Sequence, residues 1–465
     1  MSDHTATAAQ NSSAASLESL YRRHLEQMDG WLADAIERAG ARGVAVDGVL
    51  FHAGRPREYH RDDRVVVFRP TAHYRRWVPP QGGPEHVVAA RPGRTPVVVR
   101  VIPKDFWYDN TPPETSHWEE AVELLEVASP GEVRGALESV LAGATWAYFG
   151  DSPEAAAELG VDAELIEPDA LRMPLDWSRA TKTDYEVALS REACAAGARG
   201  HLAAREGLEQ GWSELEVHLA FLRAARCPEE RLPFDSIVAL NEKSAILHYQ
   251  NKRLEPPESS QVLLVDSGAD FCGYASDVTR TWVSHDAPDT FRSLVAAVDT
   301  MERQLVAMVA PGRSYVEIHL ECHRQTAEIL KAHDLITCSP EEAVATRLTR
   351  TFMPHGVGHQ LGLQVHDVGG QQSAADGGQT PPPDEHVLRN TRTLSAGHLV
   401  TIEPGFYFIP MLLDAVRAGE QSSHVNWTLV DALTPCGGIR IEDDVLCTPD
   451  GYEDLTRGLI QPVEA

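Results

Sequence analysis

The order in which apolar segments follow one another is the feature that most constrains the fold of this chain. Apolar residues recur at helical spacing over residues 184–226, strands and turns are indicated over 236–282, helical spacing returns over 291–334, and strand patterns resume from 352 onward. Strands and helices therefore come in blocks and do not alternate, which disfavours a parallel sheet with crossover helices. The pattern predicts an α+β domain built around a largely antiparallel sheet.

A different pattern precedes these blocks. A helix is predicted over residues 17–42, short strands over 44–51, 65–68, 87–90 and 97–102, and further helical patterns beginning at Trp118 and Ala155. We therefore predict a mixed α/β domain at residues 17–178, with residues 168–178 as a linker, and a second domain at residues 179–465. Residues 1–16 are rich in Ala, Ser and Thr and lack a basic start and an apolar block, so we expect a disordered tail and no secretory signal.

Composition excludes several classes of protein. The formal net charge of -28 would repel a phosphate backbone, so nucleic acid is not expected as a partner. No apolar run reaches the roughly 20 residues of a membrane helix, so no membrane partner is expected. The seven cysteines form no CxxC pair, which argues against a thiolate zinc site and favours the cytoplasm.

Two aspartates frame a predicted hairpin. An aliphatic strand ends at Asp266, and Asp277 follows eleven residues later at the start of the next strand. This separation fits a hairpin that brings both carboxylates together, and it equally fits a structural turn.

A glycine-rich segment carries three histidines, His355, His359 and His366. A lone histidine is usually a core residue, but glycines at 356, 358 and 362 allow the backbone to bend so that several imidazoles converge. We interpret this segment as part of a site.

Two glutamates stand in apolar strand patterns. Alternation places Thr401 with Glu403 on one face of a strand, and Arg440 with Glu442 on one face of another. A buried glutamate needs a partner, which could be an arginine for either one alone. Metal ions are the better partner for several such residues together.

Four carboxylates and one imidazole form a hard, oxygen-rich ligand set that suits Mn²⁺, Co²⁺, Fe²⁺ or Zn²⁺. Two divalent ions balance four carboxylates, and paired metals activate water for attack on a carbonyl. The constellation indicates a hydrolase.

These residues resemble the pita-bread family of creatinase and aminopeptidase, and within it the bacterial prolidases and the organophosphorus acid anhydrolases. The resemblance covers nearly the whole chain. It rests on eight motifs that occur in family order, at residues 241–249, 265–270, 276–281, 355–367, 388–392, 402–405, 423–427 and 437–443. It implies a pita-bread domain with a curved antiparallel sheet flanked by helices.

The resemblance also implies roles for individual residues. The metal ligands would be Asp266, Asp277, His359, Glu403 and Glu442, holding two divalent ions, with Mn²⁺ the expected ion and a hydroxide bridging the pair. Glu403 would shuttle a proton, and His248, His355 and His366 would face the substrate. Arg389 would meet the substrate's C-terminal carboxylate, Arg440 would orient a ligand carboxylate, and Tyr315 and Leu388 would line the pocket.

The implied activity is hydrolysis of Xaa-Pro dipeptides, with organophosphate triester hydrolysis as a side activity. Close relatives carry Tyr where this chain has Phe234, which leaves the substrate preference open. The first domain, including Trp107, would support a homodimer, although core packing explains this tryptophan equally well. The Gly- and Pro-rich residues 369–385 would form a flexible loop or a lid.

Two alternatives remain at this stage. Aminopeptidase P shares the ligands but cleaves longer Xaa-Pro peptides, and Arg389 argues for the dipeptidase. A metal-free interaction protein would keep the fold without the chemistry. All five ligand positions carry the required residue types, which argues against it.

Overall fold

The computed structural model describes residues 16–79, 82–107, 116–383 and 387–460. The chain divides into two compact units, residues 1–171 with 183–186 and residues 172–182 with 187–465. The domain boundary near residue 178 stays a prediction. So does the disordered tail, because residues 1–15 lie outside the described part of the chain.

The first unit is a mixed α/β domain, as predicted. Its helices and strands are α1 (Leu17–Ala41), β1 (Gly48–His52), α2 (Ala72–Trp77), β2 (Val87–Ala90), β3 (Val97–Val101), β4 (Glu123–Val127), α3 (Val133–Ala136), α4 (Glu138–Leu141), β5 (Trp146–Phe149) and α5 (Pro153–Leu159). Five strands form one sheet in the order β4-β3-β2-β1-β5, in which β1/β5 and β3/β4 are parallel pairs and the other two are antiparallel. Its core packs Leu50, Val99 and Tyr148 against the short helices.

Three local predictions for this part of the chain were wrong. Residues 65–68 form no strand beyond one bridge between Glu58 and Val65, and Val65, Val66 and Val67 are exposed. The helix expected from Trp118 is a single 3-10 turn followed by strand β4, because parallel pairing with β3 overrides the helical preference of this Glu- and Leu-rich segment.

The predicted linker at residues 168–178 is instead helix α6 (Asp169–Arg179). Pro174 lies inside this helix, where it removes one backbone hydrogen bond. The helix persists because Leu171 and Leu175, four residues apart, are both buried on one of its faces.

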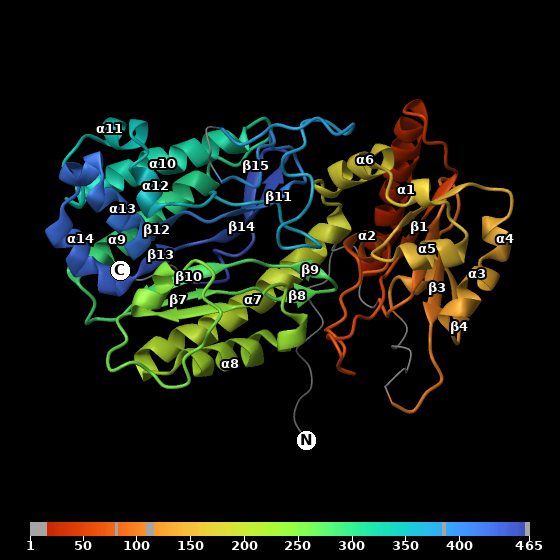
Figure 1. Ribbon diagram of the computed structural model, residues 1–465, viewed down its shortest axis with the longest axis horizontal. Coiled ribbons are helices and arrows are strands. Elements are labelled where there is room, and N and C mark those ends of the chain that lie inside the picture. Colours follow the sequence, from red (N-terminus) through yellow and green to blue (C-terminus); the bar gives the residue numbers. More distant parts are fainter. Residues whose placement is uncertain (1–15, 80–81, 108–115, 384–386, 461–465) are drawn as a thin grey trace, which may run out of the picture. The chain divides into compact units, whose positions relative to one another are not determined.

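The second unit begins within α6 and carries the remaining elements, except that residues 184–186 at the start of α7 belong to the first unit (Figure 1). They are α7 (Asp184–Gln210), α8 (Glu214–Ala225), β6 (Ile237–Leu240), β7 (Val262–Asp266), β8 (Asp270–Phe271), β9 (Tyr274–Ala275), β10 (Thr279–Val283), α9 (Asp289–Val306), α10 (Tyr315–Ala332), α11 (Pro340–Ala345), α12 (Thr349–Phe352), β11 (Leu399–Ile402), β12 (Gly405–Tyr407), α13 (Pro410–Ala418), α14 (Trp427–Leu433), β13 (Gly438–Arg440), β14 (Asp443–Thr448) and β15 (Gly451–Asp454). The helix and strand blocks follow the predicted order, and the α+β class is confirmed.

The sheets of this unit are antiparallel and open. They comprise β10-β7-β6, β11-β14-β15 and the pair β12-β13, and a bridge between Thr279 and Glu442 joins the first to the segment after β13. Figure 1 shows helices α7 and α8 on one side of the strands, with α9 and α10 on the other. The main core of the unit lies between α9, α10 and strands β11 to β14.

Alternation along β7 separates the core from the candidate site. Leu263 and Val265 pack against α7 and α8, whereas Leu264 points to the opposite face together with Ile237 of the neighbouring strand. Asp266 is two residues beyond Leu264 and therefore shares the face that is turned away from α7 and α8.

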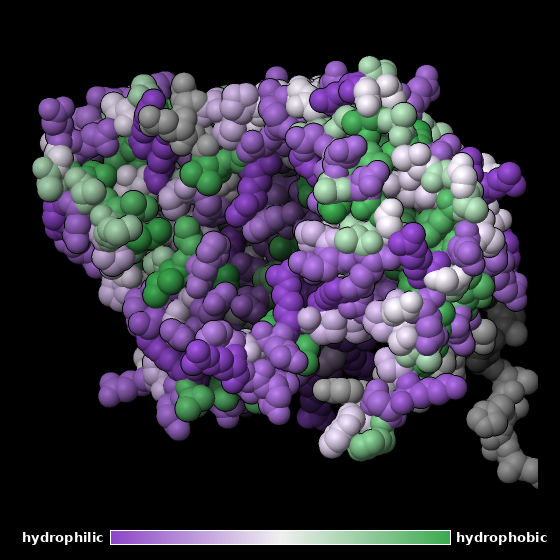
Figure 2. Space-filling model, turned by 45° about the vertical axis from the view of Figure 1, so that its right-hand side comes forward, coloured by the Kyte–Doolittle hydropathy of each residue, from purple (hydrophilic) through white to green (hydrophobic). Residues whose placement is uncertain are grey.

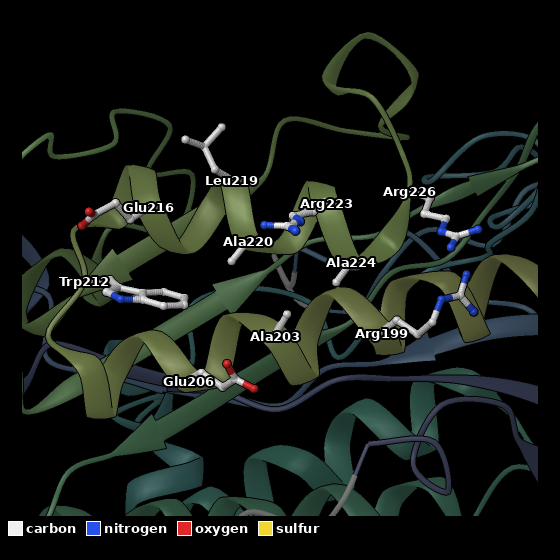
Figure 3. A pocket seen from close by; sticks show the side chains of 10 residues that line it. All are labelled: Arg199, Ala203, Glu206, Trp212, Glu216, Leu219, Ala220, Arg223, Ala224 and Arg226. Carbon is white, nitrogen blue, oxygen red and sulfur yellow. The ribbon is translucent and has the colours of Figure 1, made fainter.

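Helices α7 and α8 pack closely and leave a groove on their outer side (Figure 3). Gly200 and Gly207 permit the close approach, since a Cβ at either position would lie within 2.5 Å of Phe221 or Val217. The groove is lined by alanines between longer arginine, glutamate and tryptophan side chains. None of the predicted site residues lines it.

Hydrophilic residues cover most of the face shown in Figure 2, and hydrophobic residues form small groups between them. Within the described residues, no helix combines the length and the apolar character needed to cross a membrane.

Candidate metal centre

Two antiparallel strands bring the predicted aspartates together. Asp266 is the last residue of β7, and it pairs with Thr279, the first residue of β10. Asp277 lies two residues before Thr279, and the small hairpin of β8 and β9 occupies the intervening turn. The hairpin separation read from the sequence is therefore present between β7 and β10.

The glycine-rich segment places His359 next to Asp277. Its Nε2 lies 3.3 Å from Asp277 Oδ2 and 3.6 Å from Glu403 Oε1. Its Nδ1 lies 3.0 Å from the carbonyl oxygen of Gln360, so Nδ1 carries the hydrogen and the Nε2 lone pair faces the carboxylates. Gly358 precedes it with φ +147°, and a Cβ there would lie 2.3 Å from the carbonyl oxygen of Thr401.

Glu442 completes the cluster from the segment after β13. Its Oε2 accepts a 2.6 Å hydrogen bond from Thr279 Oγ1, and its backbone N–H donates to the Thr279 carbonyl. Ligand atoms of Asp277, His359 and Glu442, all three buried, lie within 4.8 Å of one another. Glu403, directly after β11, lies beside His359.

Arg440 is the buried cation among these acids. It donates from Nη2 to Asp266 Oδ2 at 2.6 Å, from Nη1 to the Tyr407 hydroxyl at 2.7 Å and from Nε to Thr279 Oγ1 at 3.2 Å. Tyr407 in turn lies 2.8 Å from His355 Nε2. One chain of hydrogen bonds therefore connects the Asp266 carboxylate to the His355 ring.

Burial strongly perturbs the acids of the cluster. It raises the pKa values of Asp277 and Glu442 well above those of ordinary carboxyl groups, and neighbouring carboxylates raise them further. Burial also raises the pKa of Glu403 to about 7, against the lowering effect of His359. Crowded, buried carboxyl groups keep their protons unless cations replace them.

The residues present fit divalent cations. Four carboxylates face one arginine, and Asp266 Oδ1 is buried with no hydrogen-bond partner among the described residues. Carboxylate oxygens and one imidazole nitrogen are hard or borderline donors, which suit Mn²⁺, Zn²⁺ and related ions. A cation would bind the unpaired Asp266 Oδ1 atom and offset the excess negative charge of the cluster.

A cavity of about 470 Å³ opens onto this cluster. Its lining includes all five predicted metal ligands together with His248, His355, His366, Arg389 and Arg440. The ring centroids of His359 and His366 are 4.4 Å apart in a T-shaped arrangement. Burial lowers the pKa values of His355 and His366 to about 3, so both rings are neutral at physiological pH.

Arg389 is exposed within this cavity and forms no ion pair or hydrogen bond with another described residue. Tyr315 and Leu388, predicted to line the pocket, do not line it. Tyr315 is fully buried and donates its hydroxyl to the Thr401 carbonyl at 2.7 Å, and Leu388 packs in the main core. The adjacent Val387 lines the cavity instead, because successive side chains of the segment point in opposite directions.

Residues 369–383 of the predicted loop contribute nothing to the cavity lining. They form a short turn with a bridge between Gln372 and Gln379, and residues 384 and 385 lie outside the described part. Closure of this loop over the site stays a prediction.

A layer of residues that hold the ligands was not predicted from the sequence. Arg280 is fully buried and donates to the carbonyl of Glu442 at 2.6 Å and to Asp443 Oδ1 at 2.6 Å. Arg457 binds the other oxygen of Asp443 at 2.8 Å. Arg280 could have been found from the sequence, because it is an arginine inside an apolar strand pattern. No such sequence pattern points to Arg457 or Tyr407.

Comparisons with known proteins agree with this architecture. The model of metallopeptidase family M24 matches residues 188–449, and the model of the Xaa-Pro dipeptidase N-terminal domain matches residues 19–177. The Xaa-Pro dipeptidase of Pseudoalteromonas atlantica is 36% identical over 446 residues, covering 95% of this chain and 99% of the relative. That of Shigella flexneri is 37% identical over 446 residues, covering 96% and 99%.

Among solved structures, zinc-substituted Escherichia coli aminopeptidase P in complex with product has a TM-score of 0.71 at 22% identity and covers 97% of both chains. That likeness establishes the fold alone. The family models and the full-length relatives together show that this chain belongs to metallopeptidase family M24 and is similar to its Xaa-Pro dipeptidases over nearly its whole length.

Proposed function

We propose that this protein hydrolyses Xaa-Pro dipeptides and releases proline. The observation that carries the proposal is one cavity that combines a buried acid and imidazole cluster with an exposed arginine, Arg389, that has no partner among the described residues. The bond before proline offers no N–H on its leaving side, so the enzyme must recognise the ring and the carboxylate. Arg389 supplies the charge for that carboxylate.

The proposed cofactor is a pair of divalent ions, with Mn²⁺ preferred, held by Asp266, Asp277, His359, Glu403 and Glu442. When bound, such ions supply Lewis acidity and make water nucleophilic at neutral pH. The remaining work falls to the protein, which binds the dipeptide, orients its carbonyl and moves a proton.

Glu403 is the proposed proton carrier. Its side chain is 18% exposed, compared with 12% for Asp266 and 8% for Asp277, so it is the acid of these three with most access to the cavity. Its Oε2 also lies 3.8 Å from His355 Nδ1. A carboxyl group in this position can accept a proton from water and deliver it to the leaving proline nitrogen.

The histidines contact the substrate in this proposal. Neutral His366 donates a hydrogen bond to the substrate. The single N–H of neutral His355 is taken by the Gly356 carbonyl and its Nε2 faces the Tyr407 hydroxyl, so His355 contacts the substrate through its ring, and exposed His248 lines the same cavity. Arg440 keeps the Asp266 carboxylate in a fixed orientation.

Three further features belong to the proposal. A homodimer is supported by exposed apolar residues of the first unit, since Phe106 and Trp107 are 85% and 76% exposed. A cytoplasmic location is supported by the seven cysteines, all free. Organophosphate triester hydrolysis is proposed as a side activity, because the same ligand set stabilises negative oxygen at a phosphoryl centre.

Substrate length tests the proposal against aminopeptidase P. The Mn²⁺-loaded protein should hydrolyse Ala-Pro and leave Ala-Pro-Ala intact, because Arg389 requires a carboxylate directly on proline. Cleavage of the tripeptide at a comparable rate would identify an aminopeptidase P, and failure on both peptides would return the metal-free interaction protein to consideration.

A further inference from the structure

Asp235 is a second charged residue in the candidate cavity that forms no ion pair with another described residue. It lines the cavity, is exposed, and accepts one hydrogen bond, at 3.2 Å, from Gln250 Nε2. Among the described residues no lysine or arginine forms an ion pair with it, and nearby Lys252 donates to the Gln250 carbonyl at 3.5 Å. Asp235 is therefore available to a ligand.

The charges of the cavity form a simple pattern. Its other four carboxylates belong to the candidate metal ligands, and Arg440 is bound to Asp266. Among the described residues that line the cavity, this leaves one uncommitted cation, Arg389, and one uncommitted anion, Asp235. If Arg389 receives the carboxylate of proline, Asp235 offers a site for a positive charge elsewhere on the substrate.

Strand register shows where Asp235 lies along the chain relative to Asp266. Ile237 pairs directly with Asp266, and Asp235 precedes Ile237 by two residues, which is about 7 Å of extended chain. The α-amino nitrogen of a dipeptide is only about 2.5 Å from the carbonyl carbon that must sit at the cluster. A lysine stem, which extends about 6 Å from its Cα, matches this spacing better than the α-amino nitrogen does.

The surroundings of Asp235 suit such a stem. Phe234 and Leu247 line the same cavity as Asp235, and both are partly exposed apolar residues. Lysine and arginine bury their methylene groups along apolar surface and keep the charged head near water. A cavity that is lined by these apolar residues and by an exposed carboxylate matches this division.

We propose that Asp235 selects Xaa-Pro dipeptides whose first residue is lysine or arginine. This inference rests on the proposed dipeptidase function and adds a substrate class to it. Asp235 acts on binding and takes no part in the reaction, so its effect belongs in KM.

The test compares Lys-Pro with norleucine-Pro, which has the same stem without the ammonium group, on the Mn²⁺-loaded enzyme. We expect wild-type kcat/KM to favour Lys-Pro by about threefold to fivefold, the size that a solvent-exposed ion pair supports. In Asp235→Asn the preference should disappear while norleucine-Pro is hydrolysed as before. The control Glu230→Gln removes one exposed carboxylate outside the cavity and should keep the preference.

Charge reversal provides a second variant. Asp235→Lys should favour Glu-Pro over Gln-Pro, a preference that the wild type lacks. The inference is overturned if wild type shows no preference for Lys-Pro, if Asp235→Asn retains it, or if that variant loses both substrates equally, as a role for the α-amino group would require. Failure of the dipeptidase proposal itself is distinguishable, because neither Lys-Pro nor norleucine-Pro would then be hydrolysed.

Discussion

Replacement of Arg389 by alanine should weaken dipeptide recognition without harming the protein. Arg389 is exposed and has no ion-pair partner among the described residues, so its removal leaves no buried charge behind, and unfolding free energy should change by less than about 0.5 kcal/mol. A charge-assisted hydrogen bond contributes about 1.5 to 3 kcal/mol. At about 1.4 kcal/mol per tenfold, this corresponds to a loss of about 12- to 140-fold in kcat/KM. Because Arg389 is exposed and solvent screens its charge, we expect a loss in kcat/KM near the lower end of this range.

The assay measures kcat/KM for Ala-Pro and for its C-terminal amide, which lacks the carboxylate. Arg389→Ala should lose activity on Ala-Pro, mainly through KM, and almost none on the amide, with bound metal unchanged. Arg313→Ala, which removes an exposed arginine of the same unit that is paired with Glu317, serves as the control. Equal losses on the two substrates, or unchanged kinetics on both, would refute the assigned contact.

Two further substitutions probe the scaffold of the site. The buried Asp367 carboxylate forms ion pairs with Arg179 and Lys182. These two cations hold its pKa below the usual range despite burial. Asp367→Asn removes the anion from both ion pairs and should therefore lower the unfolding free energy by about 3 to 5 kcal/mol near neutral pH. Because its pKa is lowered on folding, the ionised Asp367 carboxylate stabilises the protein fully above the unfolded pKa of about 3.9. This stabilisation is lost as the pH falls through the folded pKa. In urea denaturation, the difference in unfolding free energy between wild type and Asp367→Asn should therefore shrink below about pH 4. Gly358→Ala would place a Cβ 2.3 Å from the Thr401 carbonyl oxygen and should reduce bound metal, measured by elemental analysis, because the following residue is a ligand candidate.

Each of these substitutions has a matched control. Asp289 is fully exposed on its side chain and forms only a surface ion pair with Arg292, so Asp289→Asn should change the unfolding free energy only slightly at any pH. Gly131 has open space around it, so Gly131→Ala should leave metal content unchanged. A deficit in Asp367→Asn that is independent of pH would contradict the ion-pair account, and full metal content in Gly358→Ala would contradict the steric one.

The part of the site that could be read from the sequence is the part with a local signature. Asp266 ends an apolar strand, His359 lies among glycines, and Glu442 lies in a strand with alternating polarity, so each residue is part of a recognisable local sequence pattern. The structure brings the side chains of Asp277, His359 and Glu442 together as those patterns require. The order of helix and strand blocks was readable for the same reason, since periodicity is a local property.

What escaped prediction depends on contacts between distant segments. Nothing near Arg457 reveals that it binds Asp443 behind the ligands, and nothing local shows that Tyr315 turns into the core toward Thr401. The strand at 123–127 was likewise hidden, because its partner β3 stabilises a conformation that its own residues do not favour.

We propose that dipeptide hydrolysis requires a pair of divalent ions in this cluster. The direct measurement strips the protein with chelator, titrates it with Mn²⁺, and records Ala-Pro hydrolysis against the metal bound per chain. We predict no activity without metal, a rise that saturates at two ions per chain, and lower metal content in Glu442→Gln. Activity that persists in the stripped protein, or that saturates at one ion, would contradict the account.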